Sequence, residues 1–225
     1  MRMMTPLKTT NIHQVENRDY AEPRASIYRP IYIFESQLEN MAFIESTMLP
    51  LGTRAPDFAL PDTVSGNVVS LDDIKSDKVT VIMFLCNHCP YVHHVNPEIV
   101  RLVADYKKQG VGFAGISSND VAHYPEDSPE LMKKVAAELG YDFPYLYDES
   151  QEIAKNYDAA CTPEFYVFDG NLTLVYRGRL DDSRPGNNIP CTGSDLRSAI
   201  DAVLSGQSLS ETQYPSGGCG IKWKN

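Results

Sequence analysis

The sequence lacks a hydrophobic run long enough to cross a bilayer. Its longest apolar run extends from Val79 to Cys86 and is interrupted by Thr80, whereas a membrane-spanning helix needs about 20 apolar residues. The first residues, MRMMTPLK, lead into polar sequence without the apolar segment of a secretory signal peptide. We therefore expect a cytoplasmic protein that has no membrane partner.

Positive charge is also scarce. The 225 residues include 20 Lys and Arg against 30 Asp and Glu, a formal net charge of −10. Residues 1–40 hold five charges of each sign, so the whole acidic excess lies in 41–225. An acidic surface repels phosphate backbones and anionic lipids. Nucleic acid is therefore not an expected partner, and the apolar fraction of 42% is that of an ordinary globular domain.

Five cysteines are present, an odd number that cannot pair completely within one chain. In a reducing compartment, two closely spaced cysteines indicate a redox or metal site before a structural disulfide. The one close pair is Cys86-Asn-His-Cys89. A structural zinc site needs four ligands, commonly supplied by two such pairs, so we do not expect zinc.

Three regions follow one another along the chain. Residues 1–40 show no sustained helix or strand period, which indicates a poorly structured N-terminal extension; an arm packed onto the domain through its tyrosines is the alternative. Residues 41–206 form the predicted domain. Residues 207–225 form a Gly/Ser-rich C-terminal tail.

Strands and helices are predicted to alternate within the domain. The strands are expected at 79–85, 111–117 and 143–147, with a hairpin at 164–168 and 172–176. The helices are expected after the cysteine motif to Gln109, and at 128–140, 151–157 and 195–204. Alternation gives parallel strands, and the hairpin adds an antiparallel edge. We predict an α/β fold with a mixed central sheet and helices on both faces.

The cysteine motif lies between a predicted buried strand and a predicted helix. Cys86 would then lie at the helix N-terminus, where unpaired amides and the helix dipole stabilise a thiolate. We expect a lowered pKa for Cys86, which makes it the nucleophile, with Cys89 as the resolving thiol. His88 is expected to add positive charge beside that thiolate. Two buried, inactive cysteines are the alternative.

The segment Cys161-Thr162-Pro163 stands just before the predicted hairpin. A proline at the start of an otherwise central strand is out of place unless its peptide bond is cis. Over roughly residues 50–206 the sequence resembles the thioredoxin fold, in which a cis-proline lies beside the CxxC motif and the residue before it pairs with the substrate. The resemblance implies that Thr162 and Pro163 form the substrate platform.

Two stretches resemble a peroxiredoxin-like group of the alkyl hydroperoxide reductase/thiol-specific antioxidant type. They are Gly52-x-x-Ala-Pro-Asp-Phe58 and Cys86-Asn-His-Cys-Pro-Tyr91. The peroxiredoxin motif, Pro-x-x-x-Thr-x-x-Cys, is not complete here. If Cys89 takes the peroxidatic place, Ile82 replaces the Pro and Cys86 replaces the Thr.

We therefore predict a thiol–disulfide oxidoreductase that exchanges disulfides with protein or small-molecule thiols through Cys86 and Cys89. No bound cofactor is expected, because the electrons travel as thiols. One alternative is a thiol-dependent peroxidase. Another is a copper-binding or redox-sensing module, in which both thiolates and His88, His93 and His94 bind the metal; the simpler interpretation places His93 and His94 on the helix surface.

The remaining cysteines are Cys161, Cys191 and Cys219. Cys161 lies two residues before Pro163, so it is a candidate third thiol near the pair, and Cys191 precedes the last helix. Cys219 lies in a glycine-flanked tail, and flexibility raises the effective concentration of its thiol. We predict that any bridge formed after Cys86–Cys89 involves Cys219; incidental, unreactive thiols are the alternative for all three.

Overall fold

A five-stranded sheet lies at the centre of the computed structural model, which describes residues 43–224. Its strand order is β6-β5-β4-β8-β9. The strands are β4 (Val79–Phe84), β5 (Val111–Ser117), β6 (Tyr145–Tyr147), β8 (Glu164–Asp169) and β9 (Leu174–Gly178). All six residues of β4 are buried, as expected for an apolar, β-branched strand covered on both faces.

The sheet is mixed, as the sequence predicts. β4 pairs in parallel with β5, and β5 pairs in parallel with β6. β8 runs antiparallel to both β4 and β9. Phe84 at the end of β4 lies opposite Glu164 at the start of β8. The cysteine motif follows β4 at this end of the sheet, and Pro163 precedes β8 at the same end, so the two predicted site segments meet.

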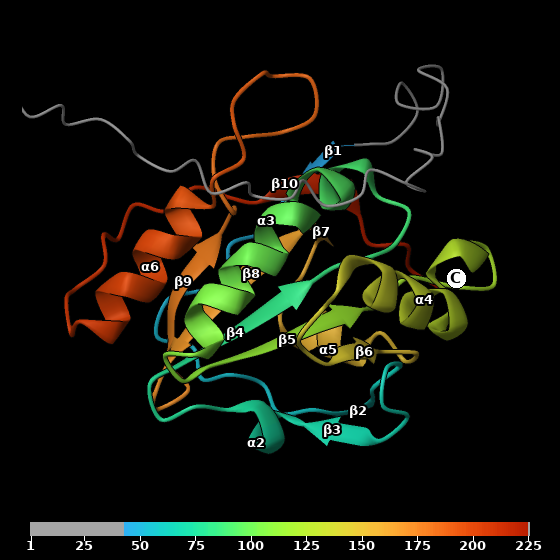
Figure 1. The fold of residues 1–225 in the computed structure, drawn as a ribbon, viewed down its shortest axis with the longest axis horizontal. Coiled ribbons are helices and arrows are strands. Elements are labelled where there is room, and N and C mark those ends of the chain that lie inside the picture. The colour runs from blue at the N-terminus through green and yellow to red at the C-terminus, as the bar shows by residue number, and fades with distance from the viewer. Residues whose placement is uncertain (1–42, 225) are drawn as a thin grey trace, which may run out of the picture. The chain divides into compact units, whose positions relative to one another are not determined.

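Helices cover both faces of the sheet (Figure 1). Val81 and Met83 of β4 point to the face covered by α3, α4 and α6. Ile82 and Phe84 point to the opposite face, which packs against α2, α5 and the β2–β3 hairpin. The helices are α2 (Leu71–Ile74), α3 (Pro90–Lys107), α4 (Pro129–Leu139), α5 (Glu152–Asn156) and α6 (Ser194–Leu204). The predicted thioredoxin-like α/β fold is confirmed.

Two smaller sheets complete this part of the chain. β2 (Ala59–Pro61) and β3 (Val68–Ser70) form an antiparallel pair. The other sheet has the order β1-β10-β7, with both pairings antiparallel. Its strands are β1 (Phe43–Glu45), β10 (Gly217–Gly220) and β7 (Cys161–Thr162). Figure 1 shows β10 beside β1.

β10 corrects the expectation of a flexible tail at 207–225. Cys219 is only 2% exposed and lies opposite Thr162 of β7. A Cβ atom added to Gly218 would lie 2.1 Å from the carbonyl oxygen of Thr162. The glycines that suggest flexibility in the sequence instead permit a close approach of two backbones.

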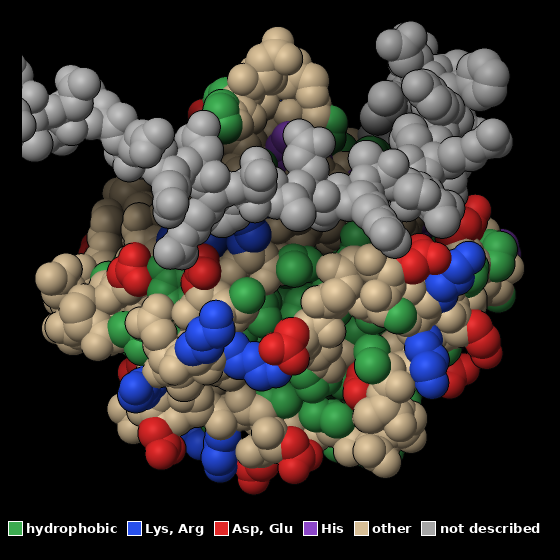
Figure 2. Space-filling view, viewed as in Figure 1, with side chains coloured by type: hydrophobic (Ala, Val, Ile, Leu, Met, Phe, Trp, Pro, Cys, Tyr) green, Lys and Arg blue, Asp and Glu red, His purple; other side chains and the backbone are tan. Residues whose placement is uncertain are grey.

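The contacts divide the chain into two units, Met1–Asn40 and Met41–Asn225. The predicted N-terminal extension, 1–40, lies outside the described residues. Within 43–224, none of the helices has the length and apolar character that crossing a membrane requires. Basic and acidic side chains are interspersed on the face shown in Figure 2.

Candidate active site

The motif Cys86-Asn-His-Cys89 connects β4 to α3. α3 begins at Pro90, and Cys89 is its N-cap, with φ −76° and ψ 123°. Proline is favoured at the first helical position because its fixed φ suits the helix and its missing N–H would have no partner there. The expectation that Cys86 lies at the helix N-terminus is therefore wrong. Cys89 takes that position, and Pro90 is the sequence signal for it.

Thr162 and Pro163 lie against the motif, as predicted, and the peptide bond between them is cis. Thr162 Oγ1 lies 3.1 Å from Cys86 Sγ. The Cys89 thiol donates to the carbonyl oxygen of Thr162 at 3.2 Å. Both cysteines are buried, with exposures of 2% for Cys86 and 0% for Cys89. The structure thus brings both thiols and the cis-proline segment into one site.

The two sulfurs differ in their preference for the thiolate form. Burial raises the pKa of Cys86 well above its ordinary value, and the contact with Cys89 adds to the increase. Burial also opposes ionisation of Cys89, but hydrogen bonds from Cys219 and Cys86 outweigh it. The Val92 amide in the first turn of α3 adds a further hydrogen bond, so the pKa of Cys89 falls well below its ordinary value. These directions place the lower pKa at Cys89 rather than at Cys86, where the sequence predicts it.

Asp127 organises the motif and was missed by sequence reasoning. It ends the short helix η1 (Pro125–Asp127) and is 0% exposed. Its Oδ1 accepts hydrogen bonds from the backbone amides of Asn87 (2.7 Å) and His88 (3.3 Å). Its Oδ2 contacts His88 Nδ1 at 2.6 Å and accepts from Asn119 Nδ2 at 2.8 Å. Asp127 lies 40 residues after Asn87, and no local pattern connects the two.

His88 is paired with Asp127 rather than with a thiolate. Its ring is stacked on Tyr124, with 5.5 Å between the ring centroids. Burial disfavours the charged ring, but the hydrogen bond and the charge of Asp127 outweigh it, so the pKa of His88 is raised. The same carboxylate contributes to the raised pKa of Cys86. His88 thus connects the loop to Asp127. A ring nitrogen of His88 and Cys86 Sγ still lie within 4.8 Å of each other, so the expected support of a Cys86 thiolate by His88 stays a prediction.

The third thiol beside the pair is Cys219. Its Sγ lies 2.7 Å from Cys89 Sγ. Cys161 instead faces the carboxylate of Glu164, with 3.9 Å between Sγ and Oε2. Burial and the charge of Glu164 raise the pKa of Cys161. Cys191 is half-buried in the loop before α6, and all five thiols are free.

β10 occupies the backbone edge that the thioredoxin resemblance assigns to the substrate. Cys219 lies opposite Thr162, and Gly220 lies opposite Cys161. An extended substrate chain can pair with Thr162 along this edge only if β10 moves away. The predicted platform at Thr162 and Pro163 is therefore covered along its backbone by the chain's own strand.

One set of possible metal ligands lies at the site. Single ligand atoms of Cys86, His88 and Asp127 lie within 4.8 Å of one another. A metal bound there would compete with the hydrogen bond between His88 and Asp127. His93 and His94, the further ligands of the copper alternative, contact other groups. His93 Nε2 contacts the carbonyl oxygen of Asn87, and His94 Nε2 lies 2.9 Å from Ser183 Oγ.

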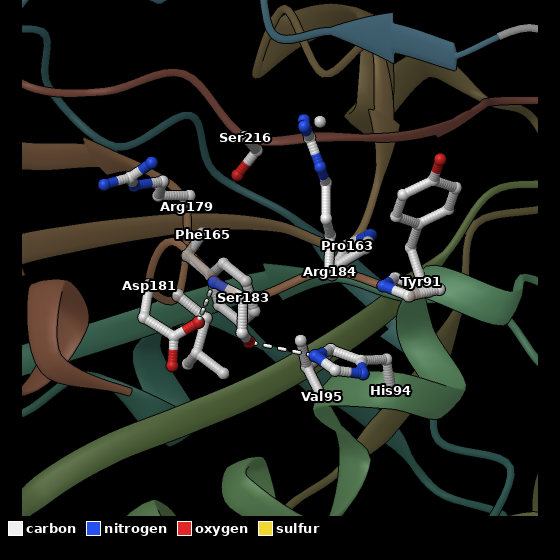
Figure 3. Close-up of a pocket in the computed structure, with 13 residues that line it drawn as sticks. Tyr91, His94, Val95, Pro163, Phe165, Arg179, Asp181, Ser183, Arg184 and Ser216 are labelled. Atoms are coloured by element: carbon white, nitrogen blue, oxygen red, sulfur yellow. Dashed lines mark hydrogen bonds between the residues drawn. The ribbon is translucent and has the colours of Figure 1, made fainter. Parts of the chain in front are cut away.

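A small cavity of about 30 Å³ opens beside Pro163. Figure 3 shows Tyr91 and His94 of α3 on one side and Arg179 on the other. Arg179 is held by Asp195, with 2.8 Å between Nε and Oδ2. Arg184 also lines the cavity and is exposed. The cavity places polar and cationic groups next to the cis-proline.

Comparison with known proteins agrees with this architecture. Residues 51–177, more than half of the chain, match the model of the AhpC/TSA family. The chain belongs to the AhpC/TSA family. The family resemblance drawn from the sequence is thereby confirmed.

Two similar proteins carry the names of redox proteins, and a third is uncharacterized. The thiol-disulfide oxidoreductase ResA of Geobacillus kaustophilus is 28% identical over 57% of this chain and 69% of its own. A putative peroxiredoxin of Mycobacterium tuberculosis is 28% identical over 54% of this chain and 72% of its own. The solved structure of an uncharacterized conserved protein from G. kaustophilus is 64% identical, covers 82% of this chain and 97% of its own, and has a TM-score of 0.81. The chain is a thioredoxin-like redox protein.

Proposed function

We propose that this AhpC/TSA protein is a thiol–disulfide oxidoreductase whose redox couple is Cys86 and Cys89. The observation that carries the proposal is the contact of both sulfurs with Thr162, next to the cis peptide bond of Pro163. Two cysteines three residues apart can form a disulfide and release it again by exchange. The reaction needs no bound cofactor, because the electrons enter and leave as thiols.

The difference between the two sulfurs assigns their roles. In the disulfide form, a substrate thiolate attacks Cys86 Sγ, a bond forms between substrate and Cys86, and Cys89 leaves as a thiolate. A second substrate thiolate attacks the sulfur of the bound substrate, which releases the oxidised substrate and leaves Cys86 to take up a proton. Thiols of low pKa leave fastest, and Cys89 is the stabilised thiolate. The reverse sequence reduces a disulfide substrate.

The position of β10 favours small substrates over extended polypeptides. Pairing of Cys219 with Thr162 covers one backbone edge of β7 next to the cis-proline. The cavity beside Pro163 remains, with His94 and Arg184 in its lining. We expect low-mass thiols and disulfides that carry a carboxylate to bind at the mouth of that cavity through Arg184 and His94, because cationic and imidazole groups bind carboxylates.

Turnover of two substrates tests the proposal. Dithiothreitol-driven reduction of oxidised glutathione is compared with reduction of the insulin disulfides, for the wild-type protein and for Cys86→Ser, Cys89→Ser and Cys191→Ser. We expect turnover of the small disulfide that is lost in the first two variants and retained in the Cys191 control. Turnover that persists without Cys86 would contradict the assigned couple, and faster reduction of insulin would contradict the substrate class.

A thiol-dependent peroxidase is the second candidate, favoured by one observation. Cys89 combines a lowered pKa with the N-cap position of α3, and a thiolate is the form that attacks a peroxide. Peroxide consumption with dithiothreitol as the electron donor separates the candidates. If peroxide is consumed faster than the small disulfide, and Cys89→Ser abolishes it, the peroxidase is the better assignment.

A further inference from the structure

β10 delivers a third thiol into the redox site. Its backbone lies directly on β7, since an added Cβ at Gly218 would meet the carbonyl oxygen of Thr162 at 2.1 Å. A Cβ at Gly217 would meet the ring of Phe43 in β1 at 2.3 Å. The strand is thus held tightly from both sides. This packing fixes Cys219 with its Sγ 2.7 Å from Cys89 Sγ.

Cys219 has a restricted choice of reaction partners. It is 2% exposed, so a bulky reagent or a partner protein does not reach it while β10 stays in place. Its sulfur neighbour is Cys89, which is itself 0% exposed. Cys89 is therefore the nearest partner for disulfide chemistry of Cys219 in the folded chain.

We infer that Cys219 is a third redox cysteine. It exchanges with the Cys86–Cys89 disulfide, forms a new disulfide with Cys89 and returns Cys86 to the thiol form. This inference rests on the proposed function. The Cys219 thiolate attacks Cys89 Sγ, the Cys89–Cys219 bond forms, and the Cys86–Cys89 bond breaks. The electron pair passes to Cys86 Sγ, which takes up the proton that Cys219 has lost. The exchange neither consumes nor releases oxidising equivalents, so it needs no further reagent.

Burial raises the pKa of Cys86 and disfavours its departure as a thiolate, but one contact acts in the opposite direction. Thr162 Oγ1 lies 3.1 Å from Cys86 Sγ, and its hydrogen bond lowers the pKa of Cys86 against the effect of burial. The contact with Cys89 is the largest cause of the raised pKa of Cys219, followed by burial. That contact loses its charge once Cys89 is part of a disulfide, so the oxidation that creates the target also eases ionisation of Cys219.

The exchange gives the site two disulfide forms with different properties. With Cys86 and Cys89 bridged, both members of the couple are oxidised. With Cys89 and Cys219 bridged, Cys86 is a free thiol at the cis-proline, while the same two oxidising equivalents are stored in the bridge from α3 to β10. The first form donates a disulfide to substrate thiols, and the second anchors β10 covalently over Thr162.

Disulfide mapping tests the inference. Reduced wild-type protein, Cys86→Ser, Cys219→Ala and the control Cys191→Ser receive one equivalent of diamide, followed by acid quenching, alkylation, digestion and mass spectrometry. In Cys86→Ser we expect a Cys89–Cys219 linked peptide whose yield is independent of protein concentration. In wild-type and Cys191→Ser protein we expect both the Cys86–Cys89 loop and the Cys89–Cys219 link, and the link disappears in Cys219→Ala.

Two results would overturn the inference. One is a folded Cys86→Ser protein in which Cys89 and Cys219 both remain alkylatable after oxidation. The other is wild-type protein that yields the Cys86–Cys89 loop without any Cys89–Cys219 linked peptide. This second result tests the inference even if the Cys86→Ser variant does not fold. Failure of the proposed function looks different: Cys219→Ala would then fail to form the Cys86–Cys89 loop.

Discussion

Replacing Asp127 by Asn tests whether one buried carboxylate holds the redox loop. The Asn side chain keeps an acceptor for the amides of Asn87 and His88. Its own NH2 group then faces two other donors. These are Asn119 Nδ2 and, when the His88 ring is charged, the protonated His88 Nδ1. Two hydrogen bonds to a charged group are lost at a site that is 0% exposed. Each contributes about 1.5–3 kcal/mol, so we expect a loss of about 3 kcal/mol or more.

For a domain of this size, a loss of that magnitude lowers the melting temperature by about 6–12 °C. Urea and thermal denaturation of the reduced protein measure the change. Asp72→Asn is the matched control, because its carboxylate pairs with Lys75 at 2.7 Å on the surface, with 78% of the Asp72 side chain exposed. Exposed pairs contribute about 0–1 kcal/mol. If both variants lose less than about 1 kcal/mol, the assigned role of Asp127 is refuted.

Three further predictions concern the thiols, β10 and His88. Alkylation of Cys89 followed against pH should have a midpoint below the value of about 8.5 for a free thiol; a midpoint at or above it contradicts the site electrostatics. Gly218→Ala should lower the melting temperature by more than the control Gly66→Ala. An added Cβ at Gly66 meets nothing within 4 Å, so this control adds only the cost of a left-handed backbone, about 1–2 kcal/mol. Equal losses of melting temperature in the two variants would show that β10 is displaced from β7 at little cost in stability. The pKa of His88 is raised on folding. The stabilisation that its charged ring contributes is therefore complete below the unfolded value of about 6.5 and is lost as pH rises through the folded pKa. A difference in unfolding free energy between wild type and His88→Gln that grows with rising pH would contradict this prediction.

The fold follows from the sequence because its signals are local. The β-branched run from Val79 marks the central strand, and Gly140 marks the end of α4 with φ 71°. The cis bond before Pro163 also follows from position, since a proline cannot donate to a central ladder. The general place of the site is therefore predictable.

The electrostatics of the site depend on residues that are distant in the sequence. Asp127 reaches the motif from 40 residues away, and Cys219 lies 130 residues from Cys89. Both shift the balance between the two thiols, and neither leaves a periodic signal. The sequence therefore predicts the position of the cysteine pair, but not the contacts that lower the pKa of Cys89 rather than that of Cys86. The glycines of 207–225 also suggest a flexible tail, whereas in the structure they permit close packing of β10. The sequence does not distinguish these two uses of glycine.

The reduction potential of the Cys86–Cys89 couple tests the central claim most directly. It is measured by equilibrating the protein with dithiothreitol and glutathione buffers and counting the alkylated thiols at both positions. A stabilised Cys89 thiolate favours the reduced form, so we predict one reversible two-electron transition at a potential above the value of about −270 mV for thioredoxin. Two thiols that remain reduced across the whole range of buffers would contradict the account.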